Sequence, residues 1–145
     1  MRNTQGFTLI EILIVIAIIG ILASLLLPAL LASQKRSYDT GAQACAKSIE
    51  SAQGLAQIDF RTYMPIGSGA GKVNKSTDGV NAACKISAMY FKDRSDAAAL
   101  TTTYVFDVWD KRGNKVFTLT PTSLQPNVSG ATAFSDTGAG GANLP

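Results

Sequence analysis

The feature that most constrains this sequence is an uncharged apolar run near the amino terminus. Residues 12–32 read ILIVIAIIGILASLLLPALLA, a run of 21 residues with a single hydroxyl group, Ser24. Because a helix rises about 1.5 Å per residue, this run covers roughly 30 Å, the thickness of a bilayer core. Gly20 and Pro28 would weaken a soluble helix, but membrane helices tolerate both. The run therefore predicts a membrane-spanning helix.

Two other interpretations of this run are a removable secretory signal peptide and a buried core helix. The apolar part of a signal peptide is usually about 7–15 residues long and ends in a small-residue cleavage site. This run is longer, and its best candidate end, residues 30–32, has leucine where a small residue is needed. A helix that is apolar on all sides needs a large protein around it, and only about 110 residues follow.

The composition argues against most catalytic functions. The 145 residues include no histidine, which removes the commonest general base and the commonest metal ligand. The segment Gly67–Lys72, GSGAGK, fails the phosphate-loop pattern because Ile66 and Val73 stand at two of its required positions. We expect no enzyme, no metal site and no cofactor, and a membrane-anchored enzyme or binding module is the weakest alternative.

A single carboxylate, Glu11, stands at the edge of the apolar stretch that starts at Phe7. A carboxylate costs about 2.5–3.5 kcal/mol at the middle of a membrane span and less near its surface. One interpretation is that the side chain of Glu11 reaches the cytosolic surface. The other is that Glu11 pairs with a positive charge supplied by another chain.

The first 36 residues resemble the amino terminus of bacterial type IV pilins. The stretch Gly6-Phe7-Thr8-Leu9-Ile10-Glu11 and the apolar run after it match the class III signal of that family. The resemblance implies a leader of residues 1–6, cleavage between Gly6 and Phe7 by a membrane prepilin peptidase, and N-methylation of Phe7. It also implies a cytosolic leader and an extracytoplasmic carboxy-terminal domain.

The resemblance assigns assembly roles to Glu11 and Pro28. Glu11 matches the family's acidic residue, which is thought to pair with the terminal amine of a neighbouring subunit, here the amine of Phe7. Such pairing relieves the desolvation cost of two charges in a low dielectric. Pro28 matches the family's helix-kinking proline. We expect three segments: the leader 1–6, a transmembrane and filament-core helix 7–34, and a globular domain 35–145.

The sequence predicts that the helix continues to about Asp59 as an amphipathic segment. Apolar residues recur there at spacings of three and four, which is typical of one helix face; they are Tyr38, Ala42, Cys45, Ile49, Ala52 and Ala56. Lys47, Glu50 and Gln53 lie off this stripe. Pro28 is expected to bend the helix or break its hydrogen-bond ladder.

Short strands are predicted after a turn-rich loop at 65–81. The runs 103–109 and 115–120 alternate apolar and polar residues around a turn at 110–114, which predicts a β-hairpin. Residues 86–91 and 132–135 are further candidate strands. The predicted fold class is α+β, with the second half of the long helix packed on a small antiparallel sheet, as in the pilin fold. The glycine-rich tail from Thr137 is either a coil ordered by packing or a flexible end.

The two cysteines, Cys45 and Cys84, are candidates for a disulfide bond. An extracytoplasmic domain can oxidise them, and Cys45 lies on the predicted inward stripe. The alternative is two small buried thiols. Their spacing excludes a C-x-x-C redox motif.

The expected function is that of a structural subunit of a type IV pilus. The alternative is a major pseudopilin of a type II secretion system, because the same signal occurs there. The expected partners are other pilin subunits, the prepilin peptidase, the pilus assembly machinery and the membrane. The expected location is the inner membrane before assembly and the cell surface afterwards, and the expected roles are adhesion, twitching motility or DNA uptake. Basic residues Lys111, Arg112 and Lys115 cluster at the hairpin turn; a solvated face of mixed charge is the simpler interpretation, and contact with DNA is the other.

Overall fold

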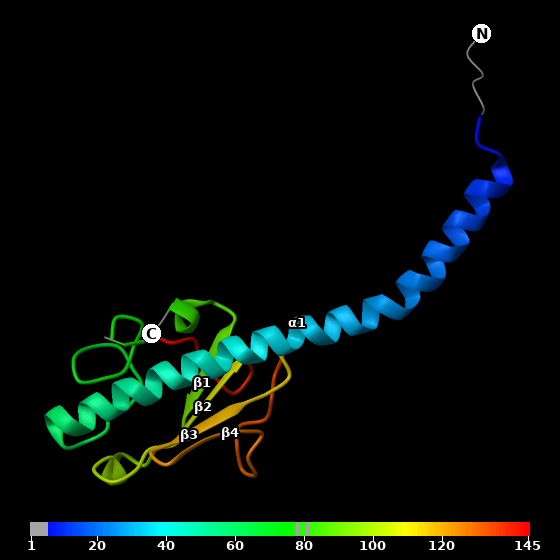
Figure 1. Ribbon diagram of the computed structural model, residues 1–145. Coiled ribbons are helices and arrows are strands. Elements are labelled where there is room, and N and C mark those ends of the chain that lie inside the picture. The colour runs from blue at the N-terminus through cyan, green and yellow to red at the C-terminus, as the bar shows by residue number, and fades with distance from the viewer. Residues whose placement is uncertain (1–5, 78, 81) are drawn as a thin grey trace. The chain divides into compact units, whose positions relative to one another are not determined.

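A single long helix dominates the amino-terminal part of the chain. The computed structural model describes residues 6–77, 79–80 and 82–145. Helix α1, labelled in Figure 1, spans Leu9–Phe60. It contains Pro28. The chain divides into two compact units, one that ends at Gln34 and a globular unit that spans Lys35–Pro145. The expected helix from Phe7 to Asp59 is confirmed to within two residues at either end.

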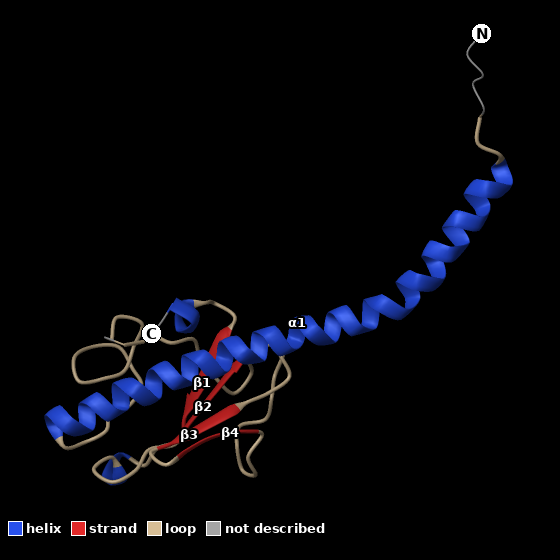
Figure 2. Ribbon diagram, viewed as in Figure 1, coloured by secondary structure: helices blue, strands red, loops and turns tan. Residues whose placement is uncertain are grey.

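The strands of the globular unit form an antiparallel meander in the order β1-β2-β3-β4 (Figure 2). Within the described residues this sheet has four strands: β1 (Met89–Asp93), β2 (Phe106–Asp110), β3 (Phe117–Thr120) and β4 (Ser123–Pro126). Two short 3-10 helices, η1 (Ala82–Lys85) and η2 (Ala97–Ala99), lie before and after β1. The predicted α+β class, a long helix with a small antiparallel sheet, is confirmed.

The hairpin of β2 and β3 is confirmed, although its strands start three and two residues later than predicted and Asp110 belongs to β2. Two other strand predictions need correction. Strand β1 starts at Met89 rather than at residue 86, because the Met89 amide first closes a turn with the carbonyl of Ile86 (2.9 Å). Residues 132–135 form no strand. The fourth strand is instead β4, which Pro121 and Thr122 connect to β3 through a two-residue turn.

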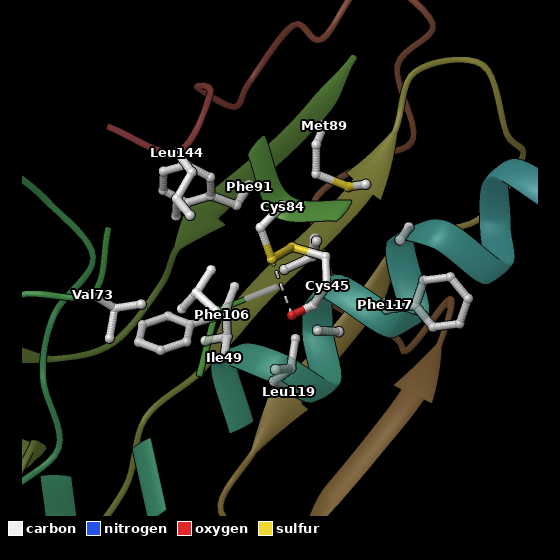
Figure 3. Packing of buried hydrophobic residues seen from close by; sticks show 14 of the residues in the cluster. Cys45, Ile49, Val73, Cys84, Met89, Phe91, Phe106, Phe117, Leu119 and Leu144 are labelled. Carbon is white, nitrogen blue, oxygen red and sulfur yellow. Dashed lines mark hydrogen bonds between the residues drawn. A yellow bond between two sulfur atoms is a disulfide. The ribbon is translucent and has the colours of Figure 1, made fainter. Parts of the chain in front are cut away.

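The core lies between the second half of α1 and the sheet. The predicted stripe is confirmed from Ala42 to Ala56, where each of its residues is at most 2% exposed. Tyr38, its first member, is only partly buried. Figure 3 shows Cys45 and Ile49 of the helix among Phe106 of β2 and Leu119 of β3. The alanines in this stripe let the helix backbone lie close to the large side chains of the strands.

Two polar residues of α1 are buried and link the helix to later segments. The carboxylate of Asp39 accepts hydrogen bonds from the backbone amides of Asn114 (2.8 Å) and Lys115 (3.0 Å). The side-chain amide of Gln53 donates to the carbonyl of Met64 and accepts from its amide (2.5 and 2.8 Å). The spacing placed Gln53 off the stripe, but it is fully buried because this paired contact satisfies it.

The carboxy-terminal segment covers the other face of the sheet. All five residues of β2 are buried, although only alternate ones face α1. On the opposite face, the indole of Trp109 donates to the carbonyl of Ser135 (3.1 Å). Along the edge of the sheet, Ala142 pairs with Phe91 of β1 as an isolated bridge. A side chain at Gly141 would overlap the ring of Trp109. The tail is therefore ordered by packing, one of the two expected states.

Asp107 joins β2, β3 and the segment at Thr132 from a fully buried position. Its carboxylate accepts two hydrogen bonds from Arg94 (2.7 and 3.0 Å), one from the Thr118 hydroxyl (2.7 Å) and one from the Thr132 amide (2.7 Å). Burial alone would raise the pKa of Asp107, but the hydrogen bonds from Arg94, Thr132 and Thr118 outweigh burial and hold the pKa below its ordinary value.

We expect Asp107→Asn to lower the free energy of unfolding by about 2–3 kcal/mol, because hydrogen bonds to a buried charge are lost. In the native protein the contribution of Asp107 is complete above about pH 4, where an unfolded aspartate is ionised, and is lost as the pH falls through the lowered folded pKa. Thermal unfolding of the detergent-solubilised chain between pH 2 and pH 7 measures both effects. Asp136→Asn, at an exposed carboxylate, is the matched control. Equal losses in the two variants would contradict this account.

Candidate processing and assembly region

The predicted cleavage junction lies in non-helical backbone just before α1. Gly6, Phe7 and Thr8 precede the first helical residue, Leu9, and the side chain of Phe7 is 83% exposed. The first five residues of the expected leader lie outside the described residues. A peptide bond outside a helix can enter a peptidase site without unwinding hydrogen-bonded structure, so the geometry of this junction is compatible with cleavage.

Thr8 and Glu11 cap the first turn of α1. The amide and the hydroxyl of Thr8 both donate to Oε2 of Glu11 (2.8 and 2.7 Å), and the Glu11 amide donates to the Thr8 hydroxyl (3.3 Å). This reciprocal arrangement is a capping box, which satisfies amides that a helix start leaves unpaired. The sequence signal was the T-x-x-E spacing, and the role of Thr8 was not anticipated.

The cap leaves part of the Glu11 carboxylate available. Within the described residues only Oε2 accepts hydrogen bonds, and Oε1 accepts none. A negative charge in the first turn is also favoured by the helix dipole. The two oxygens of Glu11 can therefore act separately. Oε2 fixes the helix start, and Oε1 is available to a cation.

The amino-terminal part of α1 presents apolar side chains on every side. From Phe7 to Leu31 the large apolar residues are 48–83% exposed. Over the described chain, one helix is long and apolar enough to cross a membrane, and its most apolar window has a mean hydropathy of 3.0 with none of it buried. Pro28 and Ser24 lie in this part, and the Ser24 hydroxyl donates to the Ile21 carbonyl (2.7 Å). Such a surface requires lipid or other protein around it.

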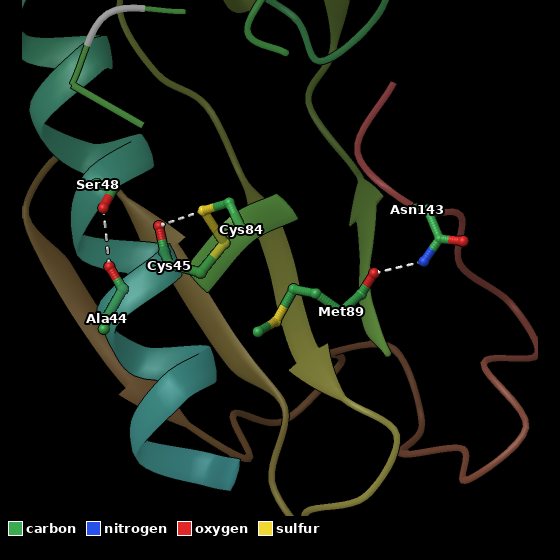
Figure 4. The surroundings of a disulfide bond; sticks show 6 residues. All are labelled: Ala44, Cys45, Ser48, Cys84, Met89 and Asn143. Carbon is green, nitrogen blue, oxygen red and sulfur yellow. Dashed lines mark hydrogen bonds between the residues drawn. A yellow bond between two sulfur atoms is a disulfide. The ribbon is translucent and has the colours of Figure 1, made fainter. Parts of the chain in front are cut away.

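A disulfide joins the two cysteines, as Figure 4 shows. Cys45 belongs to the buried stripe of α1, and Cys84 belongs to η1. Both are 1% exposed, and their Cα atoms are 4.8 Å apart. The prediction of a Cys45–Cys84 bond is confirmed. The bond fixes the loop before β1 to the helix.

Among the residues that the structure describes, no group of three or more His, Cys, Asp or Glu side chains could hold a metal ion. The chemistry of this region consists of an accessible junction, a capped carboxylate and an exposed apolar helix.

The chain matches a family motif and is similar to several known proteins. The prokaryotic N-terminal methylation motif matches residues 1–27. The chain is 54% identical over 63 residues to the type IV wide pilus major component PilA4 of Thermus thermophilus, covering 43% of this chain and 48% of that protein. It is 36% identical over 62 residues to the type II secretion system core protein G of Aeromonas hydrophila, covering 43% of each. It is also 48% identical over 52 residues to the type IV major pilin protein PilA of Myxococcus xanthus, covering 36% of this chain and 23% of that protein.

The exposed apolar helix, the antiparallel sheet and the methylation motif are the features that the resemblance to type IV pilins implies. Together with the similarity to PilA4, they support that resemblance, which was inferred from the first 36 residues. The chain spans about half the length, or less, of the curated relatives described above.

Removal of the Thr8 hydroxyl should loosen the helix start. We expect Thr8→Val to lower amide exchange protection at Ile12 about fivefold, because a cap contributes about 1 kcal/mol and the Ile12 amide bonds to the Thr8 carbonyl (3.4 Å). Amide exchange by NMR on the full chain in micelles measures this. Thr8→Ser keeps the hydroxyl and should retain protection; a loss of equal size in Thr8→Ser would contradict the capping role.

Reduction of the disulfide should destabilise the globular unit. The bonded cysteines are 39 residues apart, and closing such a loop is worth roughly 4 kcal/mol in the chain-entropy model. We expect thermal unfolding of the detergent-solubilised chain to shift to lower temperature with reductant. The Cys45→Ala/Cys84→Ala double variant is the control, since reductant should leave its transition unchanged. An unchanged transition in the native chain would argue against the bond.

Proposed function

We propose that this chain is a structural subunit of a type IV pilus filament, held in the inner membrane as a single-pass protein before assembly and displayed on the cell surface afterwards. The observation that carries the proposal is the exposed apolar surface from Phe7 to Leu31, which precedes a disulfide-linked globular unit. The methylation motif and the similarity to the Thermus wide pilus component support it.

Processing prepares the helix for assembly. A prepilin peptidase cuts between Gly6 and Phe7 and methylates the new amine, and residues 1–6 remain behind as the leader. The Phe7 amine of one subunit then pairs with Glu11 of a neighbour, whose Oε1 is available in the described structure. The bend-prone position at Pro28 adjusts the helix to its neighbours. The partners are other copies of the chain and the pilus assembly machinery.

The ion pair is important because burial of apolar surface hardly favours the assembled filament over the membrane-embedded subunit. Lipid tails are as apolar as leucine, so the helix gains almost no hydrophobic free energy when it moves from the bilayer into a bundle. Close packing and satisfied charges must then favour the filament. In this proposal Glu11 sets the axial register of each subunit against the next.

A second candidate is a major pseudopilin of a type II secretion system. The observation that favours it is the similarity to core protein G of Aeromonas hydrophila, at 36% identity. The two candidates share the processing step and differ in whether long surface filaments form. In a pilus, adhesion, twitching motility and DNA uptake would be activities of the filament and its motors.

Mass spectrometry of material sheared from cells tests the proposal, with native chain and Glu11→Gln compared. We expect native chain that begins at N-methylated Phe7 in the sheared fraction. Glu11→Gln keeps the shape but not the charge, and it should be cleaved normally while sheared material falls at least tenfold. Asp59→Asn, an exposed carboxylate on the same helix, is the control and should assemble.

Three other outcomes would count against parts of this account. A chain that still begins at Met1 would overturn processing at Gly6. Cleavage at Phe7 without sheared native material would favour the secretion pseudopilin. Normal filaments from Glu11→Gln would overturn the charge-pairing role while leaving the subunit role intact.

A further inference from the structure

Five cationic side chains gather at the end of the globular unit where α1 enters it. Lys35 and Arg36 are the first two residues of this unit, and Lys111, Arg112 and Lys115 follow β2 in the turn to β3. Asp39 brings the two groups together, because it lies one turn beyond Arg36 and accepts hydrogen bonds from the turn amides of Asn114 and Lys115 (2.8 and 3.0 Å). We call Lys35, Arg36, Lys111, Arg112 and Lys115 the juxtamembrane cationic surface.

The two carboxylates in this region, Asp39 and Asp110, offset only part of its positive charge. Asp39 and Asp110 are only 5% and 1% exposed. Asp39 is bonded to backbone amides, and Asp110 is paired with Arg112 (2.6 Å). Within the described part of the chain, no ion pair involves the side chains of Lys35, Arg36 or Lys115. Three unpaired cations therefore face outward.

A hollow of about 260 Å³ separates two of these cations. Arg36 and Lys115 line it together with polar Thr40 and Gln43, and an apolar wall is formed by Phe117 and Leu124. Asp39 and Pro126 complete the lining. A ligand that fits this hollow has an anionic group beside a short apolar portion.

Two of these cations follow the apolar run closely along α1. Lys35 is three residues beyond Ala32, the end of the apolar run, which is about 4.5 Å along a helix. The headgroup layer on each side of a bilayer is roughly 5–7 Å thick. The ring of Tyr38 lies 4.2 Å beneath the Arg112 guanidinium, and tyrosine is enriched at membrane–water interfaces.

We propose that the juxtamembrane cationic surface binds the phosphate groups of anionic phospholipids, with one headgroup in the hollow between Arg36 and Lys115. Both side chains donate to phosphate oxygens, and the half-buried Leu124 contacts the glycerol portion. The contact links the globular unit to a lipid headgroup. The inference rests on the membrane anchoring in the proposed function but not on filament formation.

Lipid titration of the full chain in detergent tests this proposal. Native mass spectrometry follows binding of phosphatidylglycerol and of phosphatidylcholine to native chain, Arg36→Gln and Lys115→Gln. We expect phosphatidylglycerol to bind native chain at least tenfold more tightly than phosphatidylcholine. Each substitution should weaken phosphatidylglycerol binding about fivefold, the effect of one cation near an anionic surface. Lys92→Gln, an exposed lysine of β1 outside the hollow, is the matched control and should bind as native chain does.

Several outcomes would overturn the proposal. Equal binding of the two lipids would remove the anionic preference, and equal loss in Lys92→Gln would remove the site. Complete competition by millimolar inorganic phosphate would assign the hollow to free phosphate rather than lipid. Preference for a short DNA duplex, lost in the same two variants, would assign it to nucleic acid. None of these results bears on cleavage at Phe7 or on sheared filaments, so the two proposals fail separately.

Discussion

The globular unit depends on close contact between a narrow stripe of α1 and the antiparallel sheet. Ala42, Ala46 and Ala52 are at most 2% exposed, and their small side chains let Phe106 and Leu119 reach the helix backbone. The remaining connections attach to the same stretch of helix: Asp39 holds the turn between β2 and β3, and the disulfide holds η1. Loss of this contact would leave a four-stranded sheet with one uncovered face.

The two parts of the one continuous helix α1 thus differ in their surroundings. Up to Leu31 its side chains are apolar in every direction and exposed, whereas from Asp39 to Ala56 it buries one side against the strands. Because lipid and a helical bundle are equally apolar, the first part can change environment at little hydrophobic cost. Charged groups therefore contribute more than apolar ones to the difference in free energy between lipid and the bundle. These groups are Glu11 at the helix start and the cations after Ala32.

The other face of the sheet is closed by polar contacts rather than by a second helix. Asp107 accepts bonds from Arg94, Thr118 and Thr132, and Trp109 donates to Ser135. A segment rich in glycine pays a high entropic cost for ordering, so it needs such specific partners. The close approach of Gly141 to Trp109 leaves no room for a side chain there, which explains why small residues suit this tail.

The features that follow from local periodicity could be predicted from the sequence alone. The apolar run, the extent of α1, the buried stripe, the hairpin of β2 and β3, and the motif from Gly6 to Glu11 all appear as fixed spacings in the chain. The burial of polar residues could not be predicted in this way. The hydrogen-bond partners of Asp39, Gln53 and Asp107 lie 75, 11 and 11 to 25 residues away. The tertiary structure also replaced the strand expected at 132–135 by β4, because that segment gives its Thr132 amide to Asp107 instead of to a ladder. Such long-range hydrogen bonds leave no periodic signal, so they become visible only when the sheet and the helix are in contact.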